Sequence, residues 1–414
     1  MNLSAQPAAR AQDTDIVHDA SRVDSSTIEV AQPLNDVLRA AGLSARLRFD
    51  NKTIVVGGAA NGTKSIIEFR FASREIFERL VSSLRLYDFA KAFFDQQLDV
   101  VGPFTDAVDV LYAINLAADK RRTLLEQAGA ILFRIAKATI PSIALRFDSD
   151  AHYSMNAEAY ELFLDHYMQY TCGKALSPSD DLDQMQVNKF RLIEDLVRQN
   201  RGWVQGIKHL DIGCGWGGLL AYFTQQLATD SVGNTNSQAQ KAYAESHYGA
   251  KVELGDFSQA LSNSEAYDLV TIIGMAEHLT PRRRTQLFQA VRRSLKREGL
   301  VYFQCIARPS AWIGGDAYRL AYEDVFPGHY LESRTEMERR FEALGFEILF
   351  AADDAMDYSK TTALWAGNIE RNHVRMAELV GERSYRILLS YLAYASKLFA
   401  SDRGSLMRYM LRLG

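Results

Sequence analysis

A glycine-rich stretch at residues 209–218, HLDIGCGWGG, has the spacing that most clearly indicates ligand binding. Gly213, Gly215 and Gly217 follow a short apolar run that is typical of a buried strand. Glycine permits a sharp turn from strand to helix and lets the backbone approach a ligand closely. The stretch therefore predicts a nucleoside-binding loop, and other residues must identify the cofactor.

The residues near the end of the next strand narrow the choice of cofactor. A dinucleotide site has an acidic residue there for the ribose hydroxyls, but residues 232–238 read VGNTNSQ. Thr235, Ser237 and Gln240 offer neutral hydrogen-bonding groups instead. The GK[ST] pattern of phosphate-binding loops does not follow the glycines either. S-adenosylmethionine (SAM), a mononucleoside with a sulfonium and an amino-acid tail, suits this loop better than NAD or a nucleoside triphosphate.

Several further segments share an order and spacing with one known family. They are HYSMNAEAYELFLDHYMQYTCGKALSPSDDLDQMQVNKF (152–190), LDIGCGWGG (210–218), GNTNSQAQ (233–240), YDLVTIIGMAEHL (267–279), SLKREGLVYF (294–303), WIGGDAYRLAYEDVFPGHYLESRTEM (312–337), YSKTTALWAGNIE (358–370) and YLAYASKLFASDRGSLMRYML (391–411). Together they resemble the cyclopropane fatty acid synthases, also called mycolic acid cyclopropane synthases, within the SAM-dependent methyltransferases. The first domain resembles, more loosely, the N-terminal domain of the bacterial members that act on phospholipids.

The resemblance implies which residues contact SAM. An aromatic face suits the adenine or the sulfonium, and a carboxylate can accept a hydrogen bond from the adenine amine. For Asp256 the alternative is a turn-capping aspartate. The implied contacts are Tyr170, Gly213, Gly215, Thr235 and Gln240, with Asp256 and Phe257 flanking the adenine.

The resemblance also implies transfer of a methyl carbon to the double bond of an unsaturated acyl chain, in a phospholipid. The resulting carbocation must lose a proton, and the family is known for holding a bicarbonate ion as the base. We expect Glu277 just past a strand end, where a buried carboxylate can orient a proton or act as the base itself. The matching base-site positions are Cys172, Glu277, Gln304, Ile306 and Tyr358.

Structural alternatives exist for several of these residues. Glu277 could be an N-cap-like acid before a helix that begins near Pro281. Cys172 could be a packed small hydrophobe, and Tyr170 and Tyr358 could be core aromatics. His152 and His278 have no partners at ligand spacing, so we predict no metal site.

Gln304 departs from the family pattern, which usually has a histidine at this strand position. Glutamine donates and accepts hydrogen bonds, but it cannot carry a proton at neutral pH. Slower deprotonation would allow a hydride shift and loss of a proton elsewhere. Two products therefore stay open, a cyclopropane ring and a methyl-branched or otherwise methylated chain.

Alternating strand and helix patterns after residue 185 predict a doubly wound, mostly parallel α/β sheet, the Rossmann-like fold of class I SAM methyltransferases. We divide the chain into a flexible tail (1–25), a small α+β domain that engages lipid (26–118), a basic amphipathic linker helix (119–147) and the catalytic domain (148–414). The last two quoted segments are similar to the C-terminal helices of the family.

The composition is that of a globular chain, with 414 residues, 47% of them hydrophobic and 24% charged. A net charge of −4 gives no overall attraction to nucleic acid. The three cysteines are too few and too scattered for a disulfide framework, and neither a secretory signal nor a long apolar run is present. We therefore expect a cytoplasmic enzyme at the inner membrane surface.

The basic run at residues 281–297 is interpreted as a solvated helix face, with anionic head-group docking as the alternative.

Two other functions stay open. One is a C-methyltransferase for a soluble secondary metabolite or a carrier-bound acyl chain, and the other is a module that binds lipid or SAM without catalysis. The altered position of Gln304 is the only feature that favours the second. The family resemblance also implies a homodimer.

Overall fold

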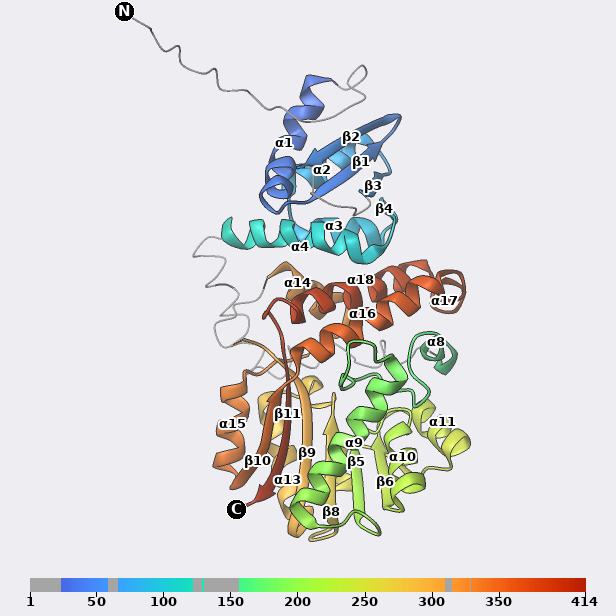
Figure 1. The fold of residues 1–414 in the computed structure, drawn as a ribbon, viewed down its shortest axis with the longest axis vertical. Coiled ribbons are helices and arrows are strands. Elements are labelled where there is room, and N and C mark those ends of the chain that lie inside the picture. Colours follow the sequence, from blue (N-terminus) through green and yellow to red (C-terminus); the bar gives the residue numbers. More distant parts are fainter. Residues whose placement is uncertain (1–23, 59–65, 122–128, 130–155, 310–314, 328) are drawn as a thin grey trace, which may run out of the picture. The chain divides into compact units, whose positions relative to one another are not determined.

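The computed structural model describes residues 24–58, 66–121, 129, 156–309, 315–327 and 329–414 (Figure 1). The predicted tail lies outside these ranges except for its last two residues. The predicted linker helix also lies outside them, apart from residues 119–121 and 129, and so does His152. The chain divides into two compact units, within residues 1–120 and 121–414.

The first unit is a four-stranded sheet with helices, in the strand order β2-β1-β3-β4. Alternate residues of β1 are buried, and Phe49 stacks on Phe77 of α2 with ring centroids 4.1 Å apart. Helix α3 was not predicted as a separate element. The elements are α1 (Ser25–Ala40), β1 (Ser44–Phe49), β2 (Lys52–Gly57), β3 (Ile67–Phe71), α2 (Arg74–Ser83), α3 (Leu86–Phe94), β4 (Leu98–Val101) and α4 (Phe104–Arg121).

The second unit contains a seven-stranded sheet in the order β10-β11-β9-β8-β5-β6-β7. The five strands from β9 to β7 are parallel to their neighbours, while β11 pairs antiparallel with both β9 and β10. The strands are β5 (Lys208–Ile212), β6 (Asp230–Thr235), β7 (Val252–Leu254), β8 (Tyr267–Ile273), β9 (Leu295–Ala307), β10 (Phe346–Asp353) and β11 (Ser405–Leu413).

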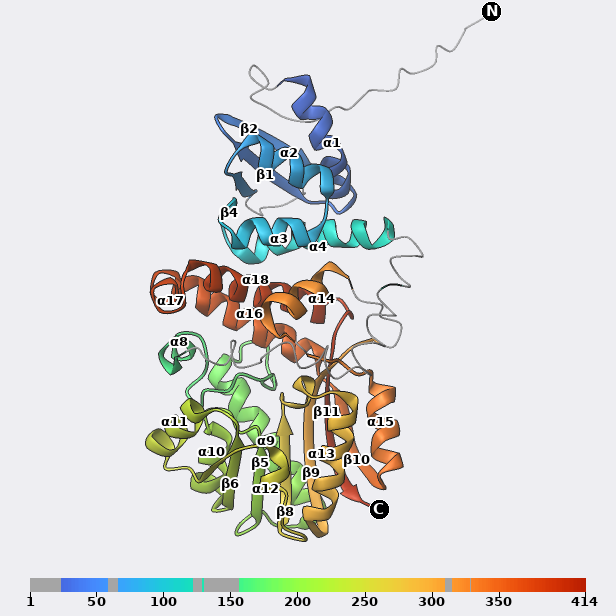
Figure 2. The same ribbon diagram turned by 180° about the vertical axis from the view of Figure 1, so that it is seen from behind.

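Helices cover both faces of this sheet (Figures 1 and 2). Phe190 of α9 and Phe223 of α10 belong to the core on one face, and Phe288 of α13 and Phe341 of α15 belong to the core on the other. The mostly parallel, doubly wound sheet is the predicted architecture. The helices are α8 (Ala157–Glu161), α9 (Leu182–Arg201), α10 (Gly218–Leu227), α11 (Gln238–Tyr248), α12 (Phe257–Ala260), η1 (Ala276–His278), α13 (Pro281–Ser294), α14 (Asp316–Leu320), η2 (Ala321–Val325), α15 (Arg334–Ala343), α16 (Ala355–Arg371), α17 (His373–Val380) and α18 (Glu382–Phe399).

The prediction that residues 391–411 are helical throughout was wrong. Helix α18 ends at Phe399, and residues 405–413 form strand β11 between β9 and β10. Six consecutive residues of β11 are buried, because helices cover both faces of the sheet. A strand buried on both faces has no polar alternation that would separate it from a buried helix in the sequence.

Gly218, the first residue of α10, provides a test of this packing. A Cβ at Gly218 would overlap the backbone carbonyl of Tyr167, whereas a Cβ at Gly367 in α16 would meet only the flexible end of Arg371. We expect Gly218→Ala to lower the free energy of unfolding by about 1–3 kcal/mol because of overpacking. Gly367→Ala should instead raise it by up to about 1 kcal/mol through helix propensity. Urea unfolding of the full chain measures both, and equal losses would contradict the predicted close approach at Gly218.

Candidate active site

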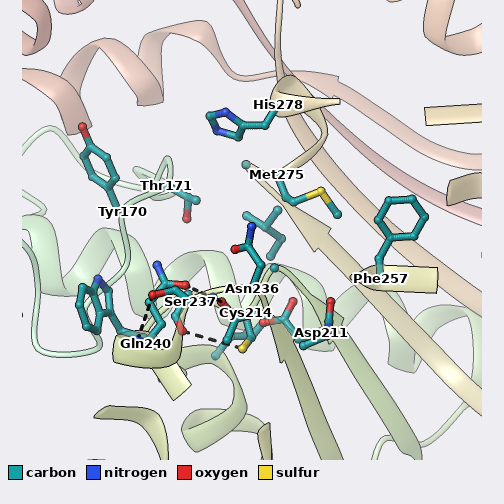
Figure 3. Close-up of a pocket in the computed structure, with 18 of the residues that line it drawn as sticks. Tyr170, Thr171, Asp211, Cys214, Asn236, Ser237, Gln240, Phe257, Met275 and His278 are labelled. Atoms are coloured by element: carbon teal, nitrogen blue, oxygen red, sulfur yellow. Dashed lines mark hydrogen bonds between the residues drawn. The ribbon is translucent and has the colours of Figure 1, made fainter. Parts of the chain in front are cut away.

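A cavity of about 660 Å³ lies at the carboxyl ends of β5, β6 and β8, where open α/β sheets bind their ligands (Figure 3). Its volume is ordinary for a small-molecule pocket. Figure 3 shows Tyr170 at one end of the cavity and Phe257 at the other. The predicted SAM contacts all line this cavity: Tyr170, Gly213, Gly215, Thr235, Gln240, Asp256 and Phe257.

The glycine-rich loop joins β5 to α10 along the cavity wall. Gly213 has a φ of +74°, in the left-handed region that glycine adopts without strain, and its N–H donates to the carbonyl of Asn234 at 2.9 Å. A Cβ at Gly217 would lie 2.6 Å from the Cβ of Ala244 in α11. Glycine at these positions therefore sets both the turn and the spacing between α10 and α11.

The end of β6 presents neutral polar groups to the cavity. The hydroxyl of Thr235 donates to Oε1 of Gln240 at 2.7 Å and accepts from the N–H of Ser237 at 3.1 Å. The amide oxygen of Gln240 is thereby occupied, so its NH₂ group is the part that can donate to a ligand. This edge of the cavity suits hydroxyl acceptors.

Asp256 both lines the cavity and caps a helix, so the turn-capping alternative is correct as well. Its carboxylate accepts from the N–H of Ser258 at 3.0 Å and from the guanidinium of Arg283. Partial burial raises the pKa of Asp256, but these hydrogen bonds outweigh it and hold the pKa below its usual value. Arg283 also lies over the ring of Phe257, 4.5 Å from the centroid. One cation, Arg283, thus contacts both Asp256 and Phe257.

Asp211 lines the cavity but was not among the predicted contacts. Its Oδ1 accepts from the hydroxyl of Thr271 at 2.6 Å. The hydroxyl oxygen of Thr271 lies 2.8 Å from Nε2 of His209, so Nε2 must carry the proton that it donates. Burial raises the pKa of Asp211 to about 6, against the hydrogen bond from Thr271 and the ammonium of Lys189. An acidic residue two positions before Gly213 was the signal that could have identified Asp211.

Lys189 is a second buried group beside the cavity. Its Nζ donates to Oε1 of Gln169 at 3.0 Å and to the hydroxyl of Thr171 at 2.8 Å, and both acceptors belong to the cavity wall. Burial lowers the pKa of Lys189, although the carboxylate of Asp165 opposes this shift. Lys189 therefore fixes the wall segment that carries Tyr170.

Glu277 lies in the short turn η1 after β8, next to His278 of the cavity wall. Its Oε1 accepts from the backbone N–H of Ile306 at 2.7 Å, and its Oε2 is buried with no hydrogen-bond partner among the described residues. Burial raises the pKa of Glu277, against that hydrogen bond. The N-cap of α13 is Thr280, so the N-cap alternative for Glu277 is wrong.

Cys172 and Gln304 lie together behind the cavity wall. The side-chain amide of Gln304 donates to the backbone carbonyl of Cys172 at 3.3 Å, and its Oε1 accepts from the hydroxyl of Tyr302 at 3.2 Å. The thiol of Cys172 donates to the carbonyl of Gly173 at 3.1 Å. Burial raises the pKa of Cys172 to about 12, so the thiol is neutral. The side chain of Cys172 therefore behaves as a packed small hydrophobe, which was the structural alternative for this residue.

Tyr358 lies in the first turns of α16, where it is buried and packs on Phe399 with ring centroids 4.6 Å apart. One turn later, the hydroxyl of Thr361 accepts from the N–H of Gly173 at 3.2 Å, which ties this helix to the segment that carries Cys172. None of the five predicted base-site residues is among the described residues that line the cavity. Cys172 and Glu277 each follow or precede a wall residue in sequence, and the backbone carbonyl of Gln304 accepts from the N–H of Gly274 in the wall at 3.0 Å. Ile306 is joined to the wall through Glu277, and Tyr358 through Trp365, whose ring packs on Tyr170.

A buried ion-pair cluster supports the Glu277 turn from the basic run of α13. Arg284 donates to the carbonyl of Ala276 at 2.6 Å and pairs with Glu332 at 3.0 Å. The N–H of Tyr330 donates to the carbonyl of Glu277 at 2.8 Å. The basic run is therefore not a uniformly solvated face, because Arg284 points inward and Arg283 lies over Phe257.

Comparisons with known proteins agree with this geometry. A family model described as mycolic acid cyclopropane synthetase matches residues 144–409. The cyclopropane-fatty-acyl-phospholipid synthase of Escherichia coli K12 is 24% identical over 359 residues, covering 83% of this chain and 87% of that protein. The sphingolipid C9-methyltransferase of Candida albicans is 26% identical over 361 residues, covering 79% of this chain and 66% of that protein.

Among solved structures, the mycolic acid cyclopropane synthase CmaA1 complexed with SAH and CTAB is similar, with a TM-score of 0.58. The two chains are 22% identical, and the match covers 64% of this chain and 96% of that one. This likeness confirms the predicted Rossmann-like fold of the class I SAM methyltransferases.

Asp211 gives the cavity a predicted pH dependence. An ionised carboxylate attracts the ammonium group of S-adenosylhomocysteine, and the pKa of about 6 means that Asp211 is ionised above that pH and protonated below it. We expect the affinity for S-adenosylhomocysteine to fall about tenfold between pH 7.5 and pH 5. The other wall carboxylate and the wall imidazole keep their protonation states over this range, because hydrogen bonds hold the pKa of Asp256 below its usual value and burial lowers the pKa of His278 to about 4.

Isothermal titration calorimetry of Asp211→Asn should give weaker binding that no longer changes with pH. Asp268→Asn is the control, since Asp268 pairs with Arg201 and Lys296 at the start of β8, away from the cavity. An unaltered pH profile in Asp211→Asn would remove Asp211 from ligand binding.

Proposed function

Because the chain belongs to the mycolic acid cyclopropane synthetase family of SAM-dependent methyltransferases, we propose that it transfers a methyl carbon from SAM to the double bond of an unsaturated acyl chain in a phospholipid. The observation that carries the proposal is Glu277, a buried carboxylate next to the wall residue His278, whose Oε2 has no hydrogen-bond partner in the part of the chain that the structure describes. The phospholipid-acting relative, which matches 83% of the chain, supports the choice of substrate.

The cavity residues bind and orient the cofactor in this proposal. SAM, when bound, supplies an electrophilic methyl group on a sulfonium. The NH₂ group of Gln240 is placed to donate to a ribose hydroxyl, and Asp256 with Phe257 to hold the adenine. Asp211 then faces the cationic part of the cofactor, and the aromatic ring of Tyr170 lies at the opposite end from Phe257 (Figure 3).

The electron pair of the acyl double bond would form the new C–C bond to the methyl carbon, while the S–CH₃ bond would break and leave its electron pair on the sulfur of S-adenosylhomocysteine. A positive charge is then left on the second alkene carbon. A C–H bond must then break, and its electrons close a ring or form a new double bond. We assign the proton to Oε2 of Glu277, because burial raises the pKa of this carboxyl and no described group occupies that oxygen. The same carboxylate would stabilise the cation before the proton leaves.

We propose that a bicarbonate ion binds beside Glu277 through two contacts. Oε2 of Glu277 can accept its hydroxyl proton, and the second N–H of Gln304 can donate to one of its oxygens. Such an ion would supply an additional base. The backbone N–H of Ile306 already donates to Glu277, so its role in this proposal is to hold that carboxylate.

The product is proposed as either a cyclopropane ring or a methylated chain without a ring. Gln304 cannot accept the proton that a histidine in its place could, which favours loss of a proton at more than one carbon.

Among the described residues, no helix is long and apolar enough to cross a membrane. Contact with a membrane surface, lipid engagement by the first unit, location in the cytoplasm and dimer formation stay predictions.

The proposed function is tested by mass spectrometry of membrane fatty acids. The chain is expressed in a bacterium that lacks its own cyclopropane synthase and is fed methyl-labelled methionine. Labelled acyl chains are the expected result, and hydrogenation then separates a ring from a double bond. Soluble protein that binds S-adenosylhomocysteine but gives no labelled lipid would contradict a membrane lipid substrate.

Glu277→Gln tests the assigned base. We expect it to keep the affinity for S-adenosylhomocysteine within about twofold and to lower turnover by about 10²–10⁴-fold, because an amide cannot accept the proton. The control is Glu347→Gln, which removes an exposed carboxylate that pairs with Arg412 on the sheet edge. Turnover of Glu277→Gln equal to that of the control would exclude Glu277 from the reaction.

A further inference from the structure

Arg408 is a fully buried guanidinium on β11 that no sequence motif indicated. Its Nε lies 2.7 Å from Oδ2 of Asp354, and its Nη2 donates to the carbonyl of Gly173 at 2.7 Å. Its Nη1 donates to the hydroxyl oxygen of Tyr302 at 3.2 Å. A buried charge with three separate partners is held in one orientation.

The contacts of Arg408 determine the direction of the hydrogen bonds that follow. A guanidinium only donates, so the oxygen of Tyr302 must accept from Arg408 and must use its own proton elsewhere. That proton is donated to Oε1 of Gln304 at 3.2 Å. The amide of Gln304 therefore cannot be turned around, and its NH₂ group faces the carbonyl of Cys172 at 3.3 Å.

The charge of Arg408 is balanced by neighbouring side chains, none of which lines the cavity. Lys174 lies 3.0 Å from both Asp354 and Asp357, and Asp357 is 4.0 Å from the guanidinium of Arg408. Two cations and two carboxylates thus form a closed group at the start of α16. Arg408 is held by this group, and its only described route toward the base site is through Tyr302 and the segment at Cys172 and Gly173.

We propose that Arg408 and Tyr302 are positioning residues that fix Gln304 as a hydrogen-bond donor next to Glu277. This assignment rests on the proposed function. One N–H of Gln304 is used by Cys172, and the described residues offer no second acceptor for the other. The position then binds an oxygen of an anion or of the substrate and takes no proton itself, so Glu277, and not Gln304, is the side chain that receives the proton of the reaction.

The experiment compares Tyr302→Phe with Tyr409→Phe in the full chain. Tyr302→Phe removes only the hydroxyl that joins Arg408 to Gln304. Tyr409 is an equally buried tyrosine on the opposite face of the same sheet, where its hydroxyl lies 3.5 Å from Glu338. Arg408→Lys, which keeps the charge but loses the planar fork, is compared in the same way with Arg412→Lys at the exposed end of β11.

Turnover is measured as labelled acyl chains, and cofactor affinity by calorimetry with S-adenosylhomocysteine. We expect Tyr302→Phe and Arg408→Lys to lower turnover at least fivefold or to change the ratio of ring to methylated product at least threefold. Affinity for S-adenosylhomocysteine should stay within twofold, and both control variants should match the unsubstituted chain within twofold.

Three results would overturn the assignment of Arg408 and Tyr302. Turnover and product ratio of Tyr302→Phe could stay within twofold, Tyr409→Phe could lose as much turnover as Tyr302→Phe, or Tyr302→Phe could weaken cofactor binding as much as turnover. A failure of the proposed function is distinct, because the unsubstituted chain would then give no labelled lipid, and the assignment would fall with it.

Discussion

The buried charge of Arg408 is the constraint on which the predicted base site and the segments around it depend. A guanidinium removed from water is tolerated only when acceptors surround it. Arg408 has a carboxylate partner in Asp354 and a carbonyl partner in Gly173. These partners come from the start of α16 and from the segment before α9, while Tyr302 comes from β9. One side chain therefore joins segments that carry four of the five predicted base-site residues, Cys172, Gln304, Ile306 and Tyr358.

Two buried carboxylates give the site its electrostatic character. Asp211 faces the cavity and Glu277 lies beside it, and burial raises the pKa of each. Carboxylates in a poorly solvated site act strongly on nearby positive charge. In the proposed reaction the positive charge moves from the sulfonium to the acyl chain, so the two acids would meet it in succession. Asp211 is kept in place by one neutral donor, the hydroxyl of Thr271, and the only cation that acts on its charge among the described residues is Lys189.

The cofactor cavity could be predicted from the sequence because its residues follow strand ends in short motifs. Gly213, Thr235 and Asp256 lie near the ends of parallel strands, and such ends meet at one edge of a sheet. Arg408 could not be predicted in this way. Its strand has no alternation, and its partners lie more than fifty residues away in sequence, so only the folded chain brings them together.

The position of β11 determines when the sheet of the second unit can be completed during synthesis. It is the last strand along the chain, yet it lies inside the sheet between β9 and β10. During synthesis those two strands emerge with no partner between them, and each presents an open edge to other chains. Completion of the sheet, and burial of the arginine that β11 carries, must wait until the ribosome has added residues 405–413. Until then the unpaired edges of β9 and β10 are open to pairing with strands of neighbouring nascent chains.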